Sequence, residues 1–468
     1  MLFNSYTFVL GFLPLVWLGF ALVVARRARA LAMVFVAVAS LVFYAWSDWR
    51  YALLILSSIL FNYACGAVLG SSIVRRHPRL SRVALGAAVA MNLGLLGYFK
   101  YTNFLLDTLD RVLGSHWQVE HITLPLALSF FTFEQITYLV DAYRGTASEH
   151  EFLGYAFFIT FFPRLIAGPI VRPGQLLPQL RRPSTFEFSA ANVGTGLVTF
   201  AVGLFKKVII ADTFAPWVEP IFDRAPTVSF SDAWGASLAF ALQLYFDFSA
   251  YSDMAIGLAL LFNIRLPENF DSPYQARSII DFWRRWHMTL SSFLRDYLYI
   301  PLGGNRTGPV RRYLNLFVTM LLGGLWHGAN WTFVMWGGLH GVYVAINHLW
   351  RRTGIELPGR ISWVLTFLAV LVGWVFFRAT SFERAGVVLA GMAGLNGFAS
   401  DGAEYSIGAH QVKRLVAGLA LVLWCPNRRS VLEWQWGSDS LYAVVFALLM
   451  GLSILQLGDP SPFLYFRF

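Results

Sequence analysis

Apolar runs of about 20 residues recur from one end of this chain to the other, and most of them hold few charged side chains. A run of that length, coiled as a helix, crosses the hydrocarbon core of a bilayer and satisfies its own backbone hydrogen bonds there. The composition agrees, since 57% of the 468 residues are hydrophobic and only 13% are charged, against roughly 25% charged in soluble proteins. The sequence therefore predicts an all-α, polytopic membrane protein.

We expect about 11 spans, together with re-entrant and interfacial helices, in one integral-membrane domain over residues 1–468. No internal repeat, low-complexity tract or separate soluble domain interrupts the pattern. The predicted apolar segments lie near residues 7–24, 31–46, 51–70, 83–106, 122–140, 190–211, 233–263, 313–326, 331–350, 361–377, 413–425 and 440–457.

The excess of basic residues predicts the topology. The formal net charge is +10. In membrane proteins such an excess of basic residues marks cytoplasmic loops that face anionic lipid. We therefore expect membrane lipids as partners and no nucleic acid. Arginines follow the first apolar run and none precedes it, which favours a retained first span with the N-terminus outside. Residues 264–312, which hold eight arginines, are expected in the cytoplasm.

Residues 156–183 form an apolar segment that is too short to cross and is broken by prolines and glycines. Irregular backbone at membrane depth requires protein or a cavity around it, so a re-entrant hairpin on the cytoplasmic side fits best. Arg164 of this segment then points into protein or lies at the interface.

Glu134, within the span at 122–140, either faces a wet cavity or is a structural carboxyl bonded to a neighbouring helix.

Residues 279–341 hold three of the nine histidines, His287, His327 and His340. Residues 279–299 read as one amphipathic helix, because Asp281 and Arg285 are spaced to pair at i and i+4 while another face is aromatic. The sequence WHGAN at 326–330 then separates two apolar runs, which places His327 within a helix break near the middle of the membrane.

These residues leave three kinds of chemistry open. A metal site has little support, because no carboxylate or thiolate accompanies the histidines and no HExxH pattern exists. A transporter would use the intramembrane histidine in a proton relay. An acyltransferase would use a histidine to take the proton from an attacking hydroxyl. Tyr251 and Asp253, in the span at 233–263, mark that helix as facing the protein interior and are candidate substrate-binding residues.

Several long motifs in order narrow these choices. They are MLFNSYTF at the start, FFPRLIAGPIVRP at 161–173, YFDFSAYSDMAIGLALLFNIRLPENFDSPY at 245–274, FWRRWHMTLSSFLRDYLYIPLGGNR at 282–306 and LWHGANWTFVMWGGLHG at 325–341. Together they resemble the membrane-bound O-acyltransferase (MBOAT) family, and within it the branch that acetylates bacterial polysaccharides. The likeness extends to about residue 380, with the core motifs at 156–349.

The resemblance implies a helical fold with a central funnel and a catalytic histidine at His327, faced by His287. On that basis Trp326 and Asn330 shape the pocket and Asp281 orients Arg285. The roles of Ser291, Ser292 and His340 are expected to be structural or supporting, and both direct transfer and an acyl-enzyme route stay open.

The same resemblance implies a multi-pass protein of the bacterial inner membrane, with no permanently bound cofactor or metal. Acetyl-CoA is the expected donor, and periplasmic acetyltransferase proteins are the expected partners. A polysaccharide is the final acceptor, with alginate favoured. The alternatives are D-alanyl transfer to teichoic acid and a non-enzymatic acetyl or polymer transporter.

Overall fold

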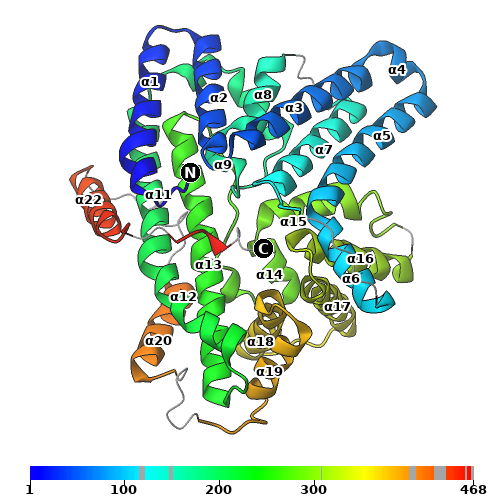
Figure 1. Ribbon diagram of the computed structural model, residues 1–468, viewed down its shortest axis with the longest axis vertical. Helices are drawn as coiled ribbons and strands as arrows, with labels where there is room; N and C mark the ends of the chain where they lie inside the picture. Colours follow the sequence, from blue (N-terminus) through cyan, green and yellow to red (C-terminus); the bar gives the residue numbers. More distant parts are fainter. Residues whose placement is uncertain are drawn as a thin grey trace. The chain divides into compact units, whose positions relative to one another are not determined.

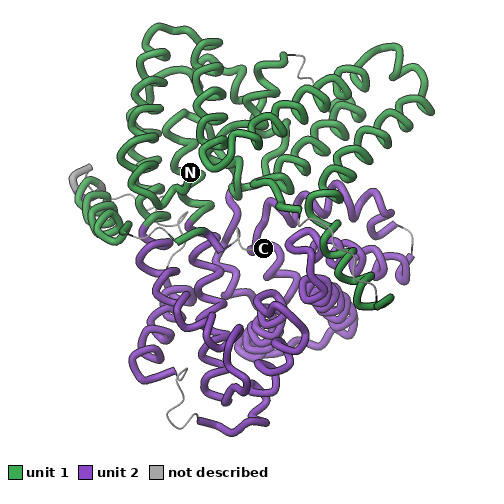
Figure 2. The backbone as a smooth tube through the Cα atoms, in the orientation of Figure 1, with its two compact units in different colours: residues 1–204, 251–267, 442–462 green, residues 205–250, 268–441, 463–468 purple. Residues whose placement is uncertain are grey.

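The computed structural model describes residues 1–114, 122–146, 151–306, 308–399, 407–425, 439–458 and 461–464. Within these residues every regular element is a helix and no strand occurs, so the all-α prediction is confirmed for the part of the chain described (Figure 1). The chain divides into two compact units (Figure 2). Unit 1 holds residues 1–204, 251–267 and 442–462, and unit 2 holds residues 205–250, 268–441 and 463–468. The single domain expected over residues 1–468 stays a prediction.

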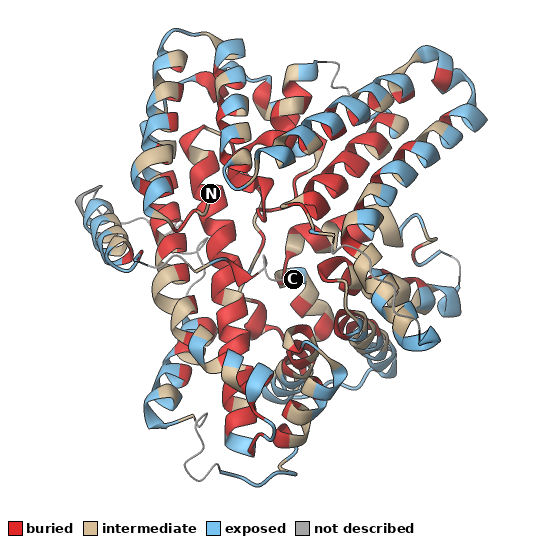
Figure 3. Ribbon diagram, viewed as in Figure 1, coloured by how far each residue is buried: buried red, intermediate tan, exposed pale blue. Residues whose placement is uncertain are grey.

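Unit 1 contains the longer apolar helices of the N-terminal half. Helix α7 is buried along almost its whole length, whereas the outer faces of α1 and α3 carry exposed leucines (Figure 3). Exposed apolar faces of this kind suit contact with lipid. The unit comprises η1 (Thr7–Phe12), α1 (Leu13–Ala25), α2 (Arg29–Ala45), α3 (Trp49–Gly70), α4 (Ser72–Arg76), α5 (Pro78–Leu96), η2 (Gly97–Tyr101), α6 (Thr102–Leu113), α7 (Leu128–Arg144), α8 (Phe152–Thr160), α9 (Phe162–Leu165), α10 (Pro173–Leu180), η3 (Pro183–Phe186) and α11 (Ala190–Phe205), with parts of α13 (Phe230–Leu261) and α22 (Asp439–Leu455).

Five helical stretches in the described residues are long and apolar enough to cross a membrane. They support a multi-pass protein, while the expected count of about 11 spans stays a prediction. The expected span at 122–140 is a 17-residue helix, α7, and the one at 233–263 is the 32-residue α13. The five stretches are Thr7–Ala25, Trp49–Gly70, Pro78–Leu113, Ala190–Arg224 and Gly359–Arg378.

The predicted break in the segment at 156–183 is confirmed, since it consists of short helices joined by irregular backbone, while the expected re-entrant hairpin stays a prediction. Helices α8 and α9 are separated at Phe161, and extended residues connect α9 to α10. Arg164 lies in α9 with its side chain fully buried, and it forms an ion pair and a hydrogen bond with Glu134 of α7. Of the two interpretations of Glu134, the structural carboxyl bonded to a neighbouring helix is therefore the one observed.

Unit 2 carries the histidine stretch and a large aromatic core. Its helices are η4 (Lys206–Ala211), α12 (Asp212–Glu219), η5 (Pro220–Arg224), the first part of α13, η6 (Pro273–Gln275), α14 (Ile279–Arg285), α15 (Met288–Leu294), η7 (Arg295–Tyr299), α16 (Pro309–His327), α17 (Trp331–Thr353), α18 (Gly359–Arg378), α19 (Phe382–Met392) and α20 (Ala409–Trp424). The core includes Trp336 and Trp374, whose rings stack with centroids 5.8 Å apart.

Helices α16 and α17 form a hairpin whose apex is the predicted WHGAN break (Figure 1). Glycines let the two backbones approach closely, because a Cβ on Gly324 would clash with the carbonyl oxygen of Phe333 and one on Gly337 would clash with that of Met320. With a rise of about 1.5 Å per residue, the 19 residues of α16 extend roughly 28 Å from Pro309 to the apex. The hairpin therefore carries His327 close to one membrane thickness away from the arginines at its open end.

Candidate functional site

His287 lies at a break between two helices, and the single amphipathic helix predicted over 279–299 is wrong. Helix α14 ends at Arg285 and Trp286 is extended. His287 then adopts the left-handed conformation, with φ 43° and ψ 53°, before α15 begins at Met288. The predicted i,i+4 pairing before the break is confirmed, because Asp281 and Arg285 form an ion pair at 2.9 Å. The left-handed residue turns the chain between the two short helices.

Asn269 holds this break from a loop 18 residues earlier in the sequence. Its carbonyl oxygen accepts the backbone N–H of Met288 at 2.9 Å. Its side-chain Oδ1 accepts from the hydroxyl of Thr289 at 2.9 Å and from the backbone N–H of Thr289 at 3.4 Å, and it lies 3.0 Å from Nδ1 of His287. An amide oxygen accepts only, so Nδ1 of His287 carries the proton. Asn269 therefore selects one tautomer of the imidazole.

The tautomer leaves Nε2 of His287 as a hydrogen-bond acceptor. The ring is fully buried, and no described residue donates to Nε2. His287 lies outside the candidate spans, and burial lowers its pKa from 6.5 to about 3. The side chain is thus neutral at physiological pH and presents a basic nitrogen with a fixed direction.

His327 ends α16 and faces His287. The centroids of the two imidazole rings are 6.4 Å apart, with an angle of 56° between their planes. His327 is 5% exposed, and its ring meets those of Trp336 and Phe377 edge to face at 5.1 and 5.4 Å. At this separation one oxygen atom of a substrate can lie within reach of a nitrogen from each ring. The structure thus brings together the two histidines that the sequence placed on facing walls.

Aromatic rings enclose the pair. Trp326 contacts both histidines, with centroids 5.0 Å from His327 and 6.5 Å from His287. Phe248 of α13 packs edge to face on His287 at 4.7 Å. Such a wall excludes water, which strengthens electrostatic interactions inside the pocket.

A cavity of about 360 Å³ lies at the apex of the α16–α17 hairpin. Asn330 caps α17, where its Oδ1 accepts from the N–H of Thr332 at 3.0 Å, and its amide donates to the carbonyl of Thr380 at 2.9 Å. The cavity is lined by Asp223, Gly328, Ala329, Asn330, Phe333, Phe377, Arg378, Ala379, Thr380 and Leu464. Phe377 both lines this cavity and contacts the ring of His327, so the cavity adjoins the histidine pair.

The other predicted site residues lie on α14 and α13. Asp281 and Arg285 are each about one-third exposed and bond to each other, and Arg285 also donates to the carbonyl of Asp271 at 3.3 Å. Neither hydrogen-bonds to a histidine in the described residues. Tyr251 and Asp253 are buried in unit 1, where Tyr251 stacks on Phe3 with centroids 5.0 Å apart. Their expected role in substrate binding stays a prediction.

His340 contributes packing on the far side of Trp336. Its ring lies 5.0 Å from that of Trp336, and its Nδ1 accepts a hydrogen bond from the indole N–H of Trp283 at 3.2 Å. The hydroxyls of Ser291 and Ser292 donate to the backbone carbonyls of Trp286 and Met288, as expected of structural serines. Among the described residues no group of three or more His, Cys, Asp or Glu side chains could hold a metal ion.

Sequence reasoning missed Asn269, which is the residue that fixes His287. Asn269 stands in the segment LPENFDSPY, which carried no charge pattern or periodicity that would single out one amide. A left-handed residue at a buried break needs an acceptor for the next backbone N–H groups, and a nearby asparagine is the expected source. That requirement becomes visible only after the break is known.

Comparison with known proteins adds four findings. The family model described as the membrane-bound O-acyltransferase family matches residues 115–383, a range that includes both histidines. Peptidoglycan O-acetyltransferase of Helicobacter pylori is 39% identical over 517 aligned residues, which cover 100% of this chain and 98% of that protein. A probable alginate O-acetylase of Pseudomonas aeruginosa is 45% identical over 395 residues, covering 82% of this chain and 73% of that protein. Teichoic acid D-alanyltransferase of Bacillus subtilis is more distant, at 27% over 283 residues, 55% of this chain and 70% of that protein.

Proposed function

Because the chain belongs to the membrane-bound O-acyltransferase family, we propose that the pocket between His287 and His327 transfers an acetyl group from acetyl-CoA to a hydroxyl. The protein is a membrane O-acyltransferase, and the acetyl group is the finer assignment, suggested by relatives that are named for it. The observation that carries the proposal is the buried pair of imidazole rings, 6.4 Å apart, inside an aromatic wall.

In this mechanism His327 acts as the general base. A ring nitrogen of His327 takes the proton from the acceptor hydroxyl, and the oxygen attacks the thioester carbonyl to form a C–O bond. The tetrahedral intermediate collapses with cleavage of the C–S bond, and the thiolate recovers the proton from the imidazolium. General base catalysis of this kind typically contributes 10²–10⁴-fold.

His287 assists through Nε2, which is held as an acceptor by the bond between Nδ1 and Asn269. A neutral acceptor facing His327 can accept a hydrogen bond from a second hydroxyl of the acceptor and so orient the reacting oxygen toward the thioester, while the proton of the reacting hydroxyl goes to His327. Because the ring is fixed at both the backbone break and Nδ1, little orientational freedom is lost when the substrate binds. Asn269 is thus a positioning residue for the reaction.

The two ends of the α16–α17 hairpin suit the two substrates. Arg311, Arg312, Arg351 and Arg352 stand at its open end, which the positive-inside rule assigns to the cytoplasm, where coenzyme A is found. The 360 Å³ cavity lies at the apex and adjoins His327, so it would admit an acceptor from the opposite side. We therefore propose donor access from the cytoplasm and acceptor access from outside the bacterial inner membrane, with periplasmic acetyltransferase proteins as partners.

The acceptor is proposed to be an extracytoplasmic polysaccharide. Alginate is favoured by five relatives named as probable alginate O-acetylases, at 42–45% identity. Peptidoglycan stands beside it, because the relative named for peptidoglycan aligns over the full length of this chain. Measuring ester-linked acetate in both polymers from a deletion strain decides between them, since only the true acceptor loses its acetate.

The catalytic proposal is tested by His327→Ala and by acetyl transfer from radiolabelled acetyl-CoA in membranes that contain the partner proteins. We expect polymer acetylation to be abolished while the amount of protein in the membrane stays normal. Ser292→Ala is a matched control, since the Ser292 hydroxyl only bonds to a backbone carbonyl within its helix. Acetylation that persists in His327→Ala would remove His327 from the mechanism.

The same assay separates the alternatives. D-alanyl transfer, suggested by the distant teichoic acid relatives, would use a carrier-bound donor and show no incorporation from acetyl-CoA. A transporter would give no covalent transfer in purified form with its partners present. Family membership favours the enzyme.

A further inference from the structure

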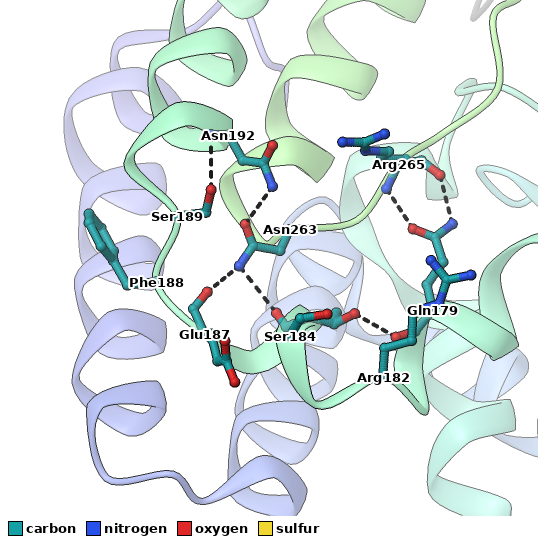
Figure 4. Close-up of a pocket in the computed structure, with 10 residues that line it drawn as sticks. Gln179, Arg182, Ser184, Glu187, Phe188, Ser189, Asn192, Asn263 and Arg265 are labelled. Carbon is teal, nitrogen blue, oxygen red and sulfur yellow. Dashed lines mark hydrogen bonds between the residues drawn. The ribbon is translucent and has the colours of Figure 1, made fainter.

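Unit 1 contains a polar cavity of about 430 Å³ that the acyl-transfer pocket does not use. It lies where α13 ends, α11 begins and the η3 turn connects α10 to α11 (Figure 4). Its lining residues are Gln179, Arg182, Ser184, Thr185, Glu187, Phe188, Ser189, Asn192, Asn263 and Arg265. The volume falls within the range of ligand pockets, which is roughly 300–1,000 Å³.

The guanidinium groups of Arg182 and Arg265 both line this cavity and have no bonded partner among the described residues. Their backbone groups are bonded, because the N–H of Arg182 donates to the carbonyl of Gln179 and Arg265 bonds to the side chain of the same glutamine. No carboxylate is paired with either side chain in the described part of the chain. Glu187, the only acidic lining residue, directs its carboxylate away from Arg265 in Figure 4. Two exposed guanidinium groups on the cavity lining are therefore left without a counter-charge among the described residues.

Two side-chain amides fix the backbone that carries these arginines. Asn263, in the left-handed conformation at φ 58°, donates to the carbonyls of Thr185 and Glu187 and accepts from the amide of Asn192 at 3.0 Å. Gln179 accepts from the N–H of Arg265 and donates to its carbonyl, both at 2.9 Å. The loop before α11 and the segment after α13 are thus tied together, so the backbone positions from which the two exposed arginines extend are fixed relative to each other.

The remaining polar groups also suit an anion. Helix α11, 16 residues long, begins at Ala190 beside the cavity, and a helix N-terminus presents backbone N–H groups and a partial positive charge. The hydroxyls of Ser184 and Ser189 add further donors at the lining, whereas the hydroxyl of Thr185 already donates to the carbonyl of Gln179. Arginine matches phosphate oxygens through two parallel N–H bonds, so a phosphate group fits this set of donors well.

The location adds a source of phosphate. Arg29, which begins α2, places its guanidinium 5.8 Å from the ring of Phe186, next to the cavity. Arg26, Arg27 and Arg29 cluster at this end of the unit, and the positive-inside rule assigns that end to the cytoplasmic surface. Phe188, on the cavity rim, is 67% exposed, as expected of an aromatic side chain that dips into the lipid interface. Anionic phospholipids and soluble phosphate esters both reach this surface.

We propose that this cavity is a phosphate-binding site in which Arg182 and Arg265 hold a phosphomonoester or phosphodiester group at the cytoplasmic end of unit 1. The site is separate from the histidine pair and does not depend on the proposed acyl transfer.

The test compares Arg182→Gln, Arg265→Gln and a matched control, Arg79→Gln. Arg79 is an exposed arginine in the first turn of α5, is also expected on the cytoplasmic side, and does not line the cavity. In the lipid arm, the purified full chain is placed in phosphatidylcholine nanodiscs with and without phosphatidylglycerol, and retained phosphatidylglycerol is counted by native mass spectrometry. In the soluble arm, binding of adenosine 3′,5′-bisphosphate to the detergent-purified chain is measured by calorimetry.

We expect each cavity variant to weaken phosphate binding by about tenfold in one arm, because a charge-assisted hydrogen bond is worth about that factor. Loss in the lipid arm identifies a phospholipid headgroup, and loss in the soluble arm identifies a free phosphate ester. Unchanged binding in both cavity variants would overturn the proposal. An equal loss in Arg79→Gln would overturn it too, because surface charge alone would then explain the binding.

Discussion

Replacing Asn269 with alanine tests whether the tautomer of His287 matters for acyl transfer. The substitution removes the acceptor for Nδ1–H of His287 and for two donors of Thr289, while the backbone carbonyl that accepts from Met288 stays in place. The helix break itself is therefore retained, and the imidazole loses the contact that sets its tautomer and direction.

The size of the effect follows from these contacts. One neutral hydrogen bond contributes about 0.5–1.5 kcal/mol, so its loss reduces the fraction of His287 in the productive orientation up to about tenfold. Two orphaned donors of Thr289 in a buried position cost roughly 1–3 kcal/mol of stability. We therefore expect Asn269→Ala to lower kcat about tenfold, with little change in KM for acetyl-CoA. His287→Ala, which removes the assisting group altogether, should cost more.

Two further variants separate positioning from stability. Thr289→Val removes the hydroxyl donor from the same Asn269 oxygen but leaves the bond to His287, so it should lose stability and keep kcat. Asn269→Asp restores an acceptor and should recover the tautomer. The negative charge of the introduced aspartate raises the pKa of His287 from about 3. His287 is then protonated at a higher pH, so activity is lost at a higher pH than in the wild type as the solution is made more acidic.

The assay is acetyl transfer from radiolabelled acetyl-CoA as a function of pH, with thermal unfolding in detergent as the stability measure. An equal loss of kcat in Asn269→Ala and Thr289→Val would refute the positioning role, because the two variants share only the structural contact. So would an unchanged pH profile in Asn269→Asp.

Four other substitutions test contacts within the two units. Burial lowers the pKa of His287 from 6.5 to about 3, so between these values the unfolded chain binds a proton that the native chain does not. Stability should therefore fall as pH drops from 6.5 toward 3, and His287→Gln should flatten this slope in thermal unfolding. Glu134→Gln leaves the buried guanidinium of Arg164 without its counter-charge, so it should lower the free energy of unfolding by roughly 3–5 kcal/mol. Denaturation in detergent measures this loss, and a near-neutral result would contradict the buried pair. Gly324→Ala should lower the free energy of unfolding by about 1–3 kcal/mol and lower acyl transfer, because its Cβ clashes with the partner helix. Gly338→Ala is the control. The nearest neighbour of its Cβ would be 3.6 Å away, so it should behave as wild type in both assays.

Features that depend on local pattern were predicted well from the sequence. The apolar runs predicted the helical class. The prolines and glycines of 156–183 predicted broken, irregular backbone, and the structure shows short helices there. The hairpin apex at 326–330 was also predicted, because Gly328 and the capping Asn330 interrupt two apolar helices. Each of these signals is carried by residues that are adjacent in the chain.

Features that depend on distant partners could not be predicted. The amphipathic spacing over 279–299 continues through His287 and favours one helix, but bonds from Asn269 stabilise a break there. Glu134 had two open interpretations because its partner, Arg164, lies 30 residues later, in a segment whose direction was unknown. Tertiary contacts decided both cases, as they commonly override local preference.

The three histidines of the central stretch show why their neighbours had to be known before their chemistry. At His287 an amide oxygen meets Nδ1, so that nitrogen carries the proton and Nε2 is the acceptor. At His340 the indole N–H of Trp283 meets Nδ1, and an indole only donates, so the neutral ring has the opposite tautomer, with its proton on Nε2. Only His287 combines a basic Nε2 with a ring that faces His327, while the ring of His340 lies behind Trp336. The identity of the partner atom, more than burial or spacing, therefore separates the assisting histidine from the packing one.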